Sequence, residues 1–309
     1  MRKSFFSFVA VVFCVFCLNA QNLTVATFNV RNDSNTEDAK NGNGWSQRYP
    51  YIAQMILFNG FDVFGVQEVL HHQLNDLLGS LPGYDYIGVG RDDGKTAGEY
   101  APIFYKKEKV ELIKTGNFWL SQQTEFPNKG WDAVLPRICT WGEFKDKDGK
   151  FRFWFFNLHM DHVGVIARQE SAKLVLSKIK EMCGNDPVIL TGDFNVDQTH
   201  ESYRLLNESG VLNDSFEKAQ IRYALNGTFN AWDPDLKTDS RIDHVFVTNS
   251  FVVNKYGVLT DTYRSPRVDS KTVQSGNFPK EVSLKEYDAR LLSDHFPVRV
   301  ELTFDKKKK

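Results

Sequence analysis

The segment Val188–Asp197, in which a short apolar run leads into Gly-Asp-Phe-Asn, constrains the fold of this chain more than any other stretch. Its run Val188–Leu190 lies between a proline and a glycine, a pattern that predicts a buried strand. Side chains two positions apart point to one face of an extended chain, so Asp193 and Asn195 are expected to face one cleft. A carboxylate beside an amide suits a phosphate, a metal ion or an attacking water. The alternative is a turn that only ends the strand.

Other segments also end in polar side chains, and together they favour a functional site over isolated turns. The motifs, in chain order, are Phe28-Asn29, Gln67-Glu68, Asn157-Leu158-His159, Gly192-Asp193-Phe194-Asn195, Arg241-Ile242-Asp243-His244 and Ser293-Asp294-His295. Each alone has a structural explanation: a charge at a helix start for Glu68, a packed core histidine for His159, or a cap for Asp294. Carboxylates, amides and imidazoles at successive strand ends are instead expected to meet in one place.

Strand and helix patterns alternate along the chain, which predicts one α/β domain over residues 21–305. Strands are expected at Leu23–Val30, Phe61–Val66, Tyr84–Gly88, Tyr100–Tyr105, Val110–Phe118 and Val188–Asn195, and around Arg241–Val247, Phe251–Tyr256 and Val298–Phe304. A hairpin is expected at Arg137–Phe144 and Phe151–Leu158. Helices are expected at Tyr49–Asn59, with Pro50 in its first turn, and at His72–Leu81, Ala167–Cys183 and near His200–Ser209. Arg31–Gly44 is expected to form a long polar loop.

The residue types at the strand ends indicate a metal-assisted reaction on a phosphate ester. Glu and Asp without cysteine offer hard oxygen ligands, which suit Mg²⁺ or Mn²⁺ better than zinc. Two histidines near several aspartates suggest an imidazole base that a carboxylate orients. No serine or cysteine stands in a nucleophile motif such as GxSxG, so a covalent acyl-enzyme is not expected. The sequence therefore predicts attack of a metal-assisted water on the ester.

In order and spacing, these motifs resemble the endonuclease/exonuclease/phosphatase superfamily, the deoxyribonuclease I-like enzymes, and the chain looks like a secreted, bacterial-type member. That group includes abasic-site endonucleases, neutral sphingomyelinases, inositol polyphosphate phosphatases and poly(A) deadenylases. Gly-Asp-Phe-Asn at 192–195 and Ser-Asp-His-Phe-Pro-Val at 293–298 are the most specific parts of the resemblance. It implies an α/β four-layered sandwich, in which two mixed β-sheets lie face to face, helices flank them, and the active site lies at one edge.

The resemblance also implies a metal site and its ligands. Glu68 would be the principal ligand of a Mg²⁺ ion, with Mn²⁺ as an alternative. Asn29 would assist in the metal or phosphate site, and Asp294 would serve the metal side.

Catalytic roles follow from the same resemblance. Asp193 and Asn195 would orient the attacking water and a phosphate oxygen. His295, oriented by Asp243, would act as the base or as a donor to the transition state. The other flank would carry His159 against the phosphate, with Glu99 in the segment Gly-Glu-Tyr-Ala-Pro placed against that histidine.

One departure from the family bears on function. Abasic-site enzymes have an acidic residue two positions after the first Asn, whereas this chain has Arg31, with Asp33 at a different spacing. DNA repair is therefore not expected.

Substrate selection is expected to come from loops that combine arginine with aromatic side chains, since these can hold a phosphate together with a base, a sugar ring or a lipid head group. The candidates are Trp45, Arg48, Arg137, Phe229 and Trp232, while His162 and Arg168 flank a segment that could line the same cleft. Ordinary packing is the alternative for each of them.

The N-terminus predicts export. Residues 1–20 combine a basic start, an apolar run at Phe5–Leu18 and a small residue at Ala20, as a cleaved signal peptide does. The apolar run is too short for a transmembrane span, which needs roughly 20 apolar residues. A lipoprotein anchored through Cys14 or Cys17 is a less favoured alternative, because the residues before each are large. A periplasmic or extracellular monomer is expected.

Charge argues against a long nucleic-acid substrate. Without Arg2 and Lys3 the chain has 36 basic and 39 acidic residues, a formal charge of −3, and the basic tail at 306–309 hides a body nearer −7. Proteins that hold a nucleic-acid backbone usually show a basic surface. Cys139 and Cys183 remain after export, too few for a disulfide scaffold, and two buried thiols are expected in preference to one bridge.

Three functional hypotheses follow. The first is a secreted, divalent-metal-dependent phosphoesterase that hydrolyses a small, glycan-linked or lipid-linked phosphate monoester or diester. The second is an extracellular nuclease on the same deadenylase-like fold. The third, a binding module without catalysis, would lack at least one central side chain, and none is missing.

Overall fold

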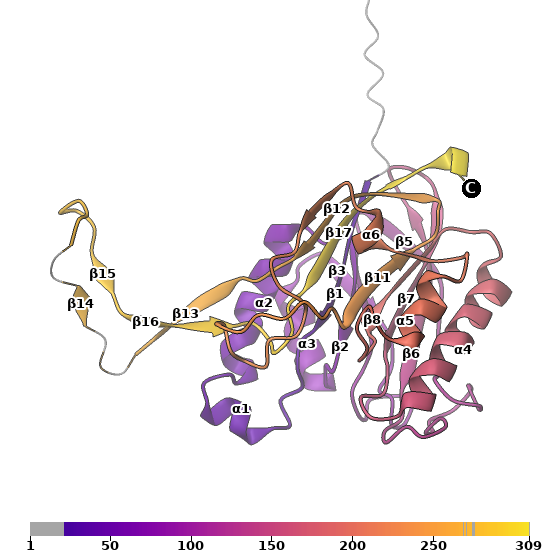
Figure 1. The fold of residues 1–309 in the computed structure, drawn as a ribbon, viewed down its shortest axis with the longest axis horizontal. Helices are drawn as coiled ribbons and strands as arrows, with labels where there is room; N and C mark the ends of the chain where they lie inside the picture. The colour runs from indigo at the N-terminus through magenta and orange to yellow at the C-terminus, as the bar shows by residue number, and fades with distance from the viewer. Residues whose placement is uncertain (1–21, 268, 270, 274–275, 309) are drawn as a thin grey trace, which may run out of the picture.

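Two mixed β-sheets lie face to face in the centre of the computed structural model, which describes residues 22–308 except 268, 270, 274 and 275 (Figure 1). The first sheet has the order β10-β12-β17-β1-β2-β4-β3, with bounds Ile221–Tyr223, Phe251–Val258, Val298–Phe304, Asn22–Asn29, Val63–Gln67, Ile103–Lys106 and Tyr84–Ile87. The second has the order β5-β6-β7-β8-β11-β9, with bounds Val110–Trp119, Ile138–Asp146, Arg152–His159, Val188–Asp193, Asp243–Val247 and Asn213–Asp214. The predicted hairpin is β6–β7.

Helices cover the outer faces of both sheets, which completes the four layers. Helices α1 (Thr36–Lys40), α2 (Trp45–Asn59) and α3 (His71–Ser80) lie on the side of the first sheet, and α4 (Val165–Cys183) and α5 (Glu201–Asn207) on that of the second, while α6 (Ser215–Lys218) lies near β11 and β12 (Figure 1). Each layer boundary holds its own apolar cluster: Ile52 packs with Phe64 under α2, and Val175 with Leu190 under α4. The predicted sandwich is confirmed.

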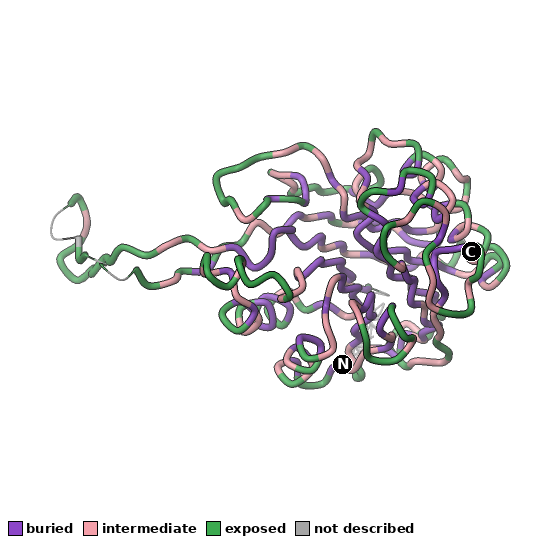
Figure 2. The backbone as a smooth tube through the Cα atoms, turned by 90° about the horizontal axis from the view of Figure 1, so that it is seen from below, coloured by how far each residue is buried: buried purple, intermediate pink, exposed green. Residues whose placement is uncertain are grey.

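The apolar layer between the sheets is rich in aromatic side chains from both. Phe144, Phe153 and Phe155 from the second sheet are fully buried against Val25 and Val300 of the first. Figure 2 shows this buried backbone running through the middle of the molecule. Because protein interiors pack at crystal-like density, this layer holds the two sheets tightly against each other.

Strand direction brings the polar strand ends to a single edge. Strand β1 runs parallel to β2, and β7 runs parallel to β8. A hydrogen bond from Asn29 at the end of β1 to Asp193 at the end of β8 shows that the ends of all four strands lie on the same side of the sandwich. Strands β11 and β17 are antiparallel to their neighbours and begin at that side. Polar residues just after the parallel strands, and just before the antiparallel ones, therefore meet.

A buried polar network links the sheets directly below this edge. Asn157 Nδ2 on β7 donates to the backbone oxygens of Val66 (2.8 Å) and Pro102 (2.9 Å). Its Oδ1 accepts from Gln67 Nε2 (2.6 Å) and Thr191 Oγ1 (3.1 Å). Two polar residues of the strand-end motifs, Asn157 and Gln67, thus lie inside the core and hold it in register.

Helix α2 begins one turn earlier than the sequence predicts. It starts at Trp45, so Pro50 lies inside the helix and not in its first turn. Trp45 and Arg48 extend the buried stripe of Ile52 and Met55 by a turn, and their packing outweighs the hydrogen bond that Pro50 cannot donate. The preceding polar loop also contains the short helix α1, which was not expected.

The largest feature that the sequence did not predict is a two-stranded arm that projects from the body (Figure 1). Strands β13 (Thr262–Pro266) and β16 (Tyr287–Leu291) form its base, and β14 (Thr272–Val273) pairs with β15 (Leu284–Lys285) further out. Most of its described residues are exposed (Figure 2), and in its base strands only Tyr263 and Leu291 are buried, so it shows little of the buried apolar pattern by which a strand is predicted.

The structure describes the two cysteines of the predicted mature chain and its C-terminal residues up to Lys308, but not the N-terminal segment of the full chain. The predicted signal peptide lies outside the described residues, as do Cys14 and Cys17, while Lys306–Lys308 forms a short 3-10 helix. Cys139 and Cys183 are both free and buried. Among the described helices, none combines the length and apolar character needed to cross a membrane.

The close approach of the sheets predicts an intolerant glycine. A Cβ atom on Gly65 would lie 2.1 Å from Asn157 Oδ1 and 2.6 Å from Thr191 Oγ1. We expect Gly65→Ala to lower the free energy of unfolding by about 1–3 kcal/mol, the usual cost of overpacking. Gly79→Ala is the control: Gly79 is exposed on α3 and its Cβ would meet nothing within 4 Å, so about 0.5–1 kcal/mol should be gained. Urea unfolding measures both, and equal stability of Gly65→Ala and wild type would contradict the tight contact.

Candidate active site

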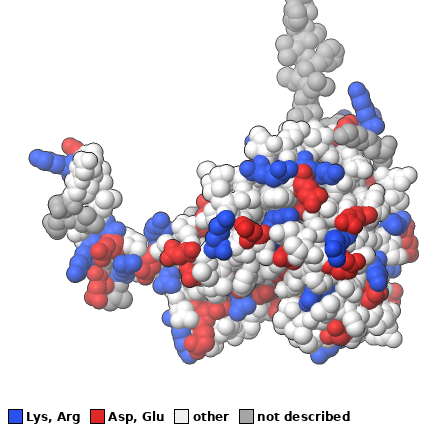
Figure 3. All heavy atoms as spheres, viewed as in Figure 1, with Lys and Arg blue, Asp and Glu red and all other residues white. Residues whose placement is uncertain are grey.

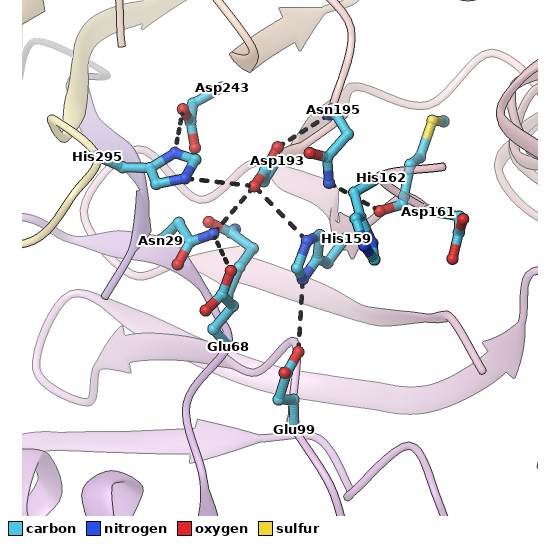
Figure 4. A network of polar contacts seen from close by, with 12 residues as sticks. Asn29, Glu68, Glu99, His159, Asp161, His162, Asp193, Asn195, Asp243 and His295 are labelled. Atoms are coloured by element: carbon cyan, nitrogen blue, oxygen red, sulfur yellow. Dashed lines mark hydrogen bonds and ion pairs between the residues drawn. The ribbon is translucent and has the colours of Figure 1, made fainter. Parts of the chain in front are cut away.

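A cleft of about 310 Å³ opens at the edge where the polar strand ends meet. Most of the predicted core set lines it: Glu68, Glu99, His159, Asp193, Asn195, Asp294 and His295. Asn29 and Asp243 lie behind this lining and hydrogen-bond to it (Figure 4). The structure thus brings all nine residues together from segments far apart in the chain.

Asn29 joins the two sheets at the floor of the cleft. It ends β1, and its Nδ2 donates to Glu68 Oε1 (3.0 Å) and to Asp193 Oδ2 (2.9 Å), which lies on the other sheet. Its Oδ1 accepts from the backbone N–H of Arg31 (3.0 Å). One amide therefore holds two carboxylates of opposite sheets at a defined separation.

Glu68 follows β2 in a backbone conformation that few residues adopt. Its φ of 63° lies in the left-handed region, which costs a non-glycine residue on the order of 1–3 kcal/mol. This conformation aims the carboxylate at the cleft, where Oε2 accepts from the backbone N–H (3.2 Å) and Nδ2 (2.9 Å) of Asn32. Burial opposes ionisation, but the hydrogen bond from Asn29 and the charge of His295 lower the pKa of Glu68.

Three strands of the second sheet present side chains in register. Asp193 on β8 pairs with His159 on β7 and with Asp243 on β11. His159 Nε2 lies 3.6 Å from Asp193 Oδ2, and its Nδ1 lies 3.8 Å from Glu99 Oε2. Burial and the nearby guanidinium of Arg137 lower the pKa of His159 well below its usual range. Its neutral ring can thus donate through one nitrogen and accept through the other.

His295 and Asp243 form a buried acid–imidazole pair (Figure 4). Asp243 Oδ2 lies 2.9 Å from His295 Nδ1, and Nε2 of the same ring lies 3.9 Å from Asp193 Oδ2. Burial alone would lower the pKa of His295, but the Asp243 carboxylate outweighs it and raises that pKa well above the usual value. The pair therefore holds a proton at the edge of the cleft.

Asp193 is the most crowded carboxylate of the site. Burial raises its pKa to about 7, and the charge of Asp243 adds to that rise. Its Oδ1 accepts from the backbone N–H of Asn195 (2.9 Å), whose φ of 50° is also left-handed. Asn195 Nδ2 in turn donates to the backbone oxygen of Met160 (3.0 Å), which fixes the amide on the wall of the cleft.

The donor atoms of the cleft fit a hard divalent cation. Ligand atoms of Glu68, His159 and Asp193 lie within 4.8 Å of one another, and so do those of Asp193, Asp243 and His295. Oxygen predominates and no described cysteine is near, a set that suits Mg²⁺ or Mn²⁺. Asp294 lines the same cleft, and burial raises its pKa. A cation at this place would offset the negative charge of Glu68 and Asp193, to which Asn29 contributes only hydrogen bonds.

The side of the cleft opposite the His295–Asp243 pair carries the positively charged side chains of Arg91 and Arg137. Arg91 Nη1 donates to Glu99 Oε2 (2.5 Å), so Glu99 is held by an ion pair as well as facing His159. Arg137 is only 3% exposed and donates through Nε to Asp161 Oδ2 (3.2 Å). Its Nη2 lies 3.0 Å from His162 Nδ1, and both residues line the cleft.

The predicted substrate loops divide between the cleft and the body. Phe229 lines the cleft at 42% exposure, with its ring edge-on to His295 at 5.1 Å between centroids. Trp45 instead packs in the core beneath α2 and donates to Asp76 Oδ2 (2.9 Å). Trp232 packs against the inter-sheet core, and its ring lies 4.9 Å from the guanidinium carbon of Arg48.

Arg48 and Arg168 also lie away from the cleft. Arg48 is 1% exposed and donates to the backbone oxygens of Asn43, Val30, Leu292 and Arg31. Burial lowers its pKa to about 10. Arg168 Nη1 donates to the backbone oxygen of Asp161 (3.0 Å). Arg48 therefore holds together the loops behind the site through its hydrogen bonds to backbone oxygens. Because Arg48, Trp45 and Trp232 do not line the cleft, the structure does not place them where the sequence predicted substrate-binding residues.

Three residues that the sequence analysis did not place in the site also line the cleft. Asn32 Nδ2 donates to both Glu68 and Glu99 (3.3 Å), which links the two acidic flanks. Arg31 Nη1 lies 3.6 Å from Asp294 Oδ2. Leu135 contributes an apolar rim at 37% exposure. The polar loop after Asn29 was the available signal for the first two, whereas nothing in the sequence singled out Leu135.

A sequence model described as Endonuclease/Exonuclease/phosphatase family matches residues 26–295, from β1 to His295. The chain belongs to this family. The match includes every residue assembled in the cleft, so the resemblance of the strand-end motifs is confirmed, and with it a phosphoesterase fold.

Solved structures of family members agree with this assignment. A mannosyl-6-phosphatase of Bacteroides thetaiotaomicron is 57% identical, with a TM-score of 0.84 over 91% of this chain and 100% of that one. A family protein of the same organism is 58% identical (TM-score 0.85; 93% and 99% covered), and one from Bacteroides vulgatus is 37% identical (TM-score 0.77; 92% and 99%). The human Nocturnin catalytic domain, at 16% identity and a TM-score of 0.63, shares the fold.

The acid–imidazole pair generates a direct prediction. In Asp243→Asn the carboxylate that raises the pKa of His295 is gone while burial remains, so that pKa should fall. Titration of the His295 ring signal by NMR, in chelator-treated protein, measures the change. His71 and His72 on α3 serve as internal references, and an unaltered His295 titration would contradict the pairing.

Proposed function

We propose that this chain is an exported, divalent-metal-dependent phosphatase that hydrolyses the phosphate monoester of a sugar or glycan. The observation that carries the reaction type is the convergence of Glu68, Asp193 and the Asp243–His295 pair in one cleft. A phosphoester hydrolase needs carboxylate oxygens that can bind a metal ion and an imidazole that carries a proton, and the cleft has both.

The side chains divide the chemistry as follows. Glu68, assisted by Asn29 and Asp294, would hold the cation, which would withdraw charge from the phosphoryl group when bound. Asp193, with its pKa near 7, orients the attacking water and can accept its proton. His295, protonated through its pair with Asp243, donates to the developing negative charge. His159 and Asn195 hold phosphate oxygens on the inner wall.

The substrate class is inferred from relatedness and from shape. The 57% identical protein with full-length coverage is a mannosyl-6-phosphatase, so a hexose phosphate is the favoured substrate. A cleft of about 310 Å³ accommodates a monosaccharide phosphate. In Figure 3, Lys and Arg are interspersed with Asp and Glu over most of the visible face, and the one blue stripe, across the upper part of the body, is short for a track that holds a nucleic-acid backbone.

Metal dependence is tested by removing the ion and by removing its proposed ligand. Chelator should abolish turnover, Mg²⁺ should restore it, and Glu68→Gln should lower kcat/KM on the order of 10²-fold or more, because the carboxylate charge is lost. The matched control is Glu108→Gln, an exposed glutamate that pairs with Lys106 at the opposite end of β4. Full activity in chelator would exclude a metal mechanism, and full activity of Glu68→Gln would remove Glu68 from it.

Substrate class is tested with a panel. Mannose 6-phosphate, glucose 6-phosphate, p-nitrophenyl phosphate, bis(p-nitrophenyl) phosphate, sphingomyelin, single-stranded DNA and RNA are compared by kcat/KM. Hexose 6-phosphates should be the best substrates, with the diesters far slower. Preferred cleavage of DNA or RNA, lost steeply as salt rises, would instead establish the nuclease alternative.

A further inference from the structure

His162 lies beside the catalytic cleft in a position unlike that of His159. It follows β7 by three residues and precedes α4, and it lines the cleft while remaining exposed (Figure 4). His159, by contrast, is buried against Asp193 and Glu99. The two rings therefore meet different parts of a bound molecule, His159 the deep part and His162 the outer part.

A buried arginine fixes the protonation pattern of this exposed ring. Arg137 Nη2 lies 3.0 Å from His162 Nδ1, and a guanidinium has donors only. His162 Nδ1 must therefore accept, which leaves the ring proton on Nε2. The Nε2–H group becomes the one polar function that the ring can turn towards a ligand, and it is a donor.

The frame behind the pair is rigid. Asp161 Oδ2 accepts from Arg137 Nε (3.2 Å), and its Oδ1 accepts from the backbone N–H of Val163 (3.0 Å) and Gly164 (2.8 Å). Burial works against ionisation, but these hydrogen bonds and the arginine lower the pKa of Asp161 to about 2. The carboxylate thus stays charged at neutral pH and keeps Arg137 in place against His162.

The surroundings of His162 suit a sugar ring better than a phosphate group. The buried imidazoles of the cleft, His159 and His295, lie deeper, next to Asp193, while the guanidinium of Arg137 beside His162 is already paired with the Asp161 carboxylate. At the rim, Leu135 is 37% exposed and Phe229, across the cleft beside His295, is 42% exposed, and both offer apolar surface to the C–H groups of a sugar. When the phosphate group of the ester is bound deep in the cleft, the sugar to which it is attached lies at this rim.

We propose that His162 determines substrate specificity, with its Nε2–H donating a hydrogen bond to a hydroxyl oxygen of the sugar alcohol that leaves when the phosphate ester is cleaved. Arg137 and Asp161 are positioning residues for that donor. The inference deepens the proposed sugar phosphatase function and rests on it.

Two substitutions of His162 separate the donor from the rest of the ring. In His162→Gln the side-chain N–H₂ can occupy the place of Nε2, so the donor is kept. In His162→Asn the shorter side chain reaches only the place of Nδ1, so it can still accept from Arg137 but has no donor at the rim. The same pair at His72, an exposed histidine on α3 outside the cleft, is the control.

The measurement is the ratio of kcat/KM for mannose 6-phosphate to kcat/KM for p-nitrophenyl phosphate, whose leaving group has no sugar hydroxyls. His162→Asn should lower this ratio on the order of 10-fold, mainly through a higher KM for the sugar phosphate, as expected for one lost hydrogen bond. His162→Gln should recover most of the ratio, and both His72 variants should keep it. A His162→Asn enzyme with the wild-type ratio, or a ratio that Gln fails to rescue, overturns the role of His162.

Two further outcomes distinguish a failure of the proposed substrate class from a failure of the His162 donor. A wild-type enzyme that hydrolyses p-nitrophenyl phosphate but neither hexose 6-phosphate overturns the proposed substrate and the role of His162 together. Independently of turnover, the ¹⁵N spectrum of chelator-treated protein should show the His162 proton on Nε2, with its signals identified by their loss in His162→Asn. A proton on Nδ1 would contradict the donor arrangement whatever the activity.

Discussion

The hydrogen bonds of Asn29 are the contacts on which the cleft depends. Its single amide group donates to Glu68 of its own sheet and to Asp193 of the other, so it sets the distance between two carboxylates that would otherwise repel. The protonated ring of His295 then balances part of this charge, because it lies between Asp243 and Asp193. An acidic site with little exposure to water is stable only when each carboxylate has such a partner or a cation.

That arrangement requires the two sheets to keep one relative position, and the polar network below the cleft provides it. Apolar layers alone resist sliding weakly, because one methyl group is much like another. Asn157 and Gln67 instead have directional partners on both sheets, and an unpaired buried amide is costly. Gly65 leaves the space in which Asn157 reaches across. Specificity of alignment thus comes from buried polar groups, and bulk stability from the aromatic layer.

The sequence predicted what depends on local patterns. Strand ends marked by Glu68, Asp193 and His295 were found because apolar runs stop at polar residues, and strand direction then brings those ends together. The resemblance to a known family supplied the roles and the pairing of sheets. Neither source could say that Glu68 has a left-handed φ, because a positive φ at a non-glycine residue is not marked by the residue type.

The misplaced loop residues have a common physical cause. Arg48 and Trp45 have the chemistry of a phosphate and ring binder, but the same guanidinium can satisfy several buried backbone oxygens, as it does here. Sequence alone does not distinguish the two uses, since both need an arginine beside aromatic residues. The projecting arm was missed for a different reason: most of its residues are exposed, and in its two base strands only Tyr263 and Leu291 are buried, which leaves little apolar pattern to mark them.

The proposed function divides reactivity and selectivity between different parts of the frame. The groups proposed to act on the phosphorus are anchored by strands and by contacts between the two sheets. The outer flank is built by a loop and the start of α4, joined through the carboxylate of Asp161 to Arg137 and to the backbone around Val163. Side chains on that flank can change without disturbing the buried charges, provided that Asp161 remains. A family with one hydrolytic core could therefore act on different alcohols by replacing residues such as His162 and Leu135, while the strand ends stay the same.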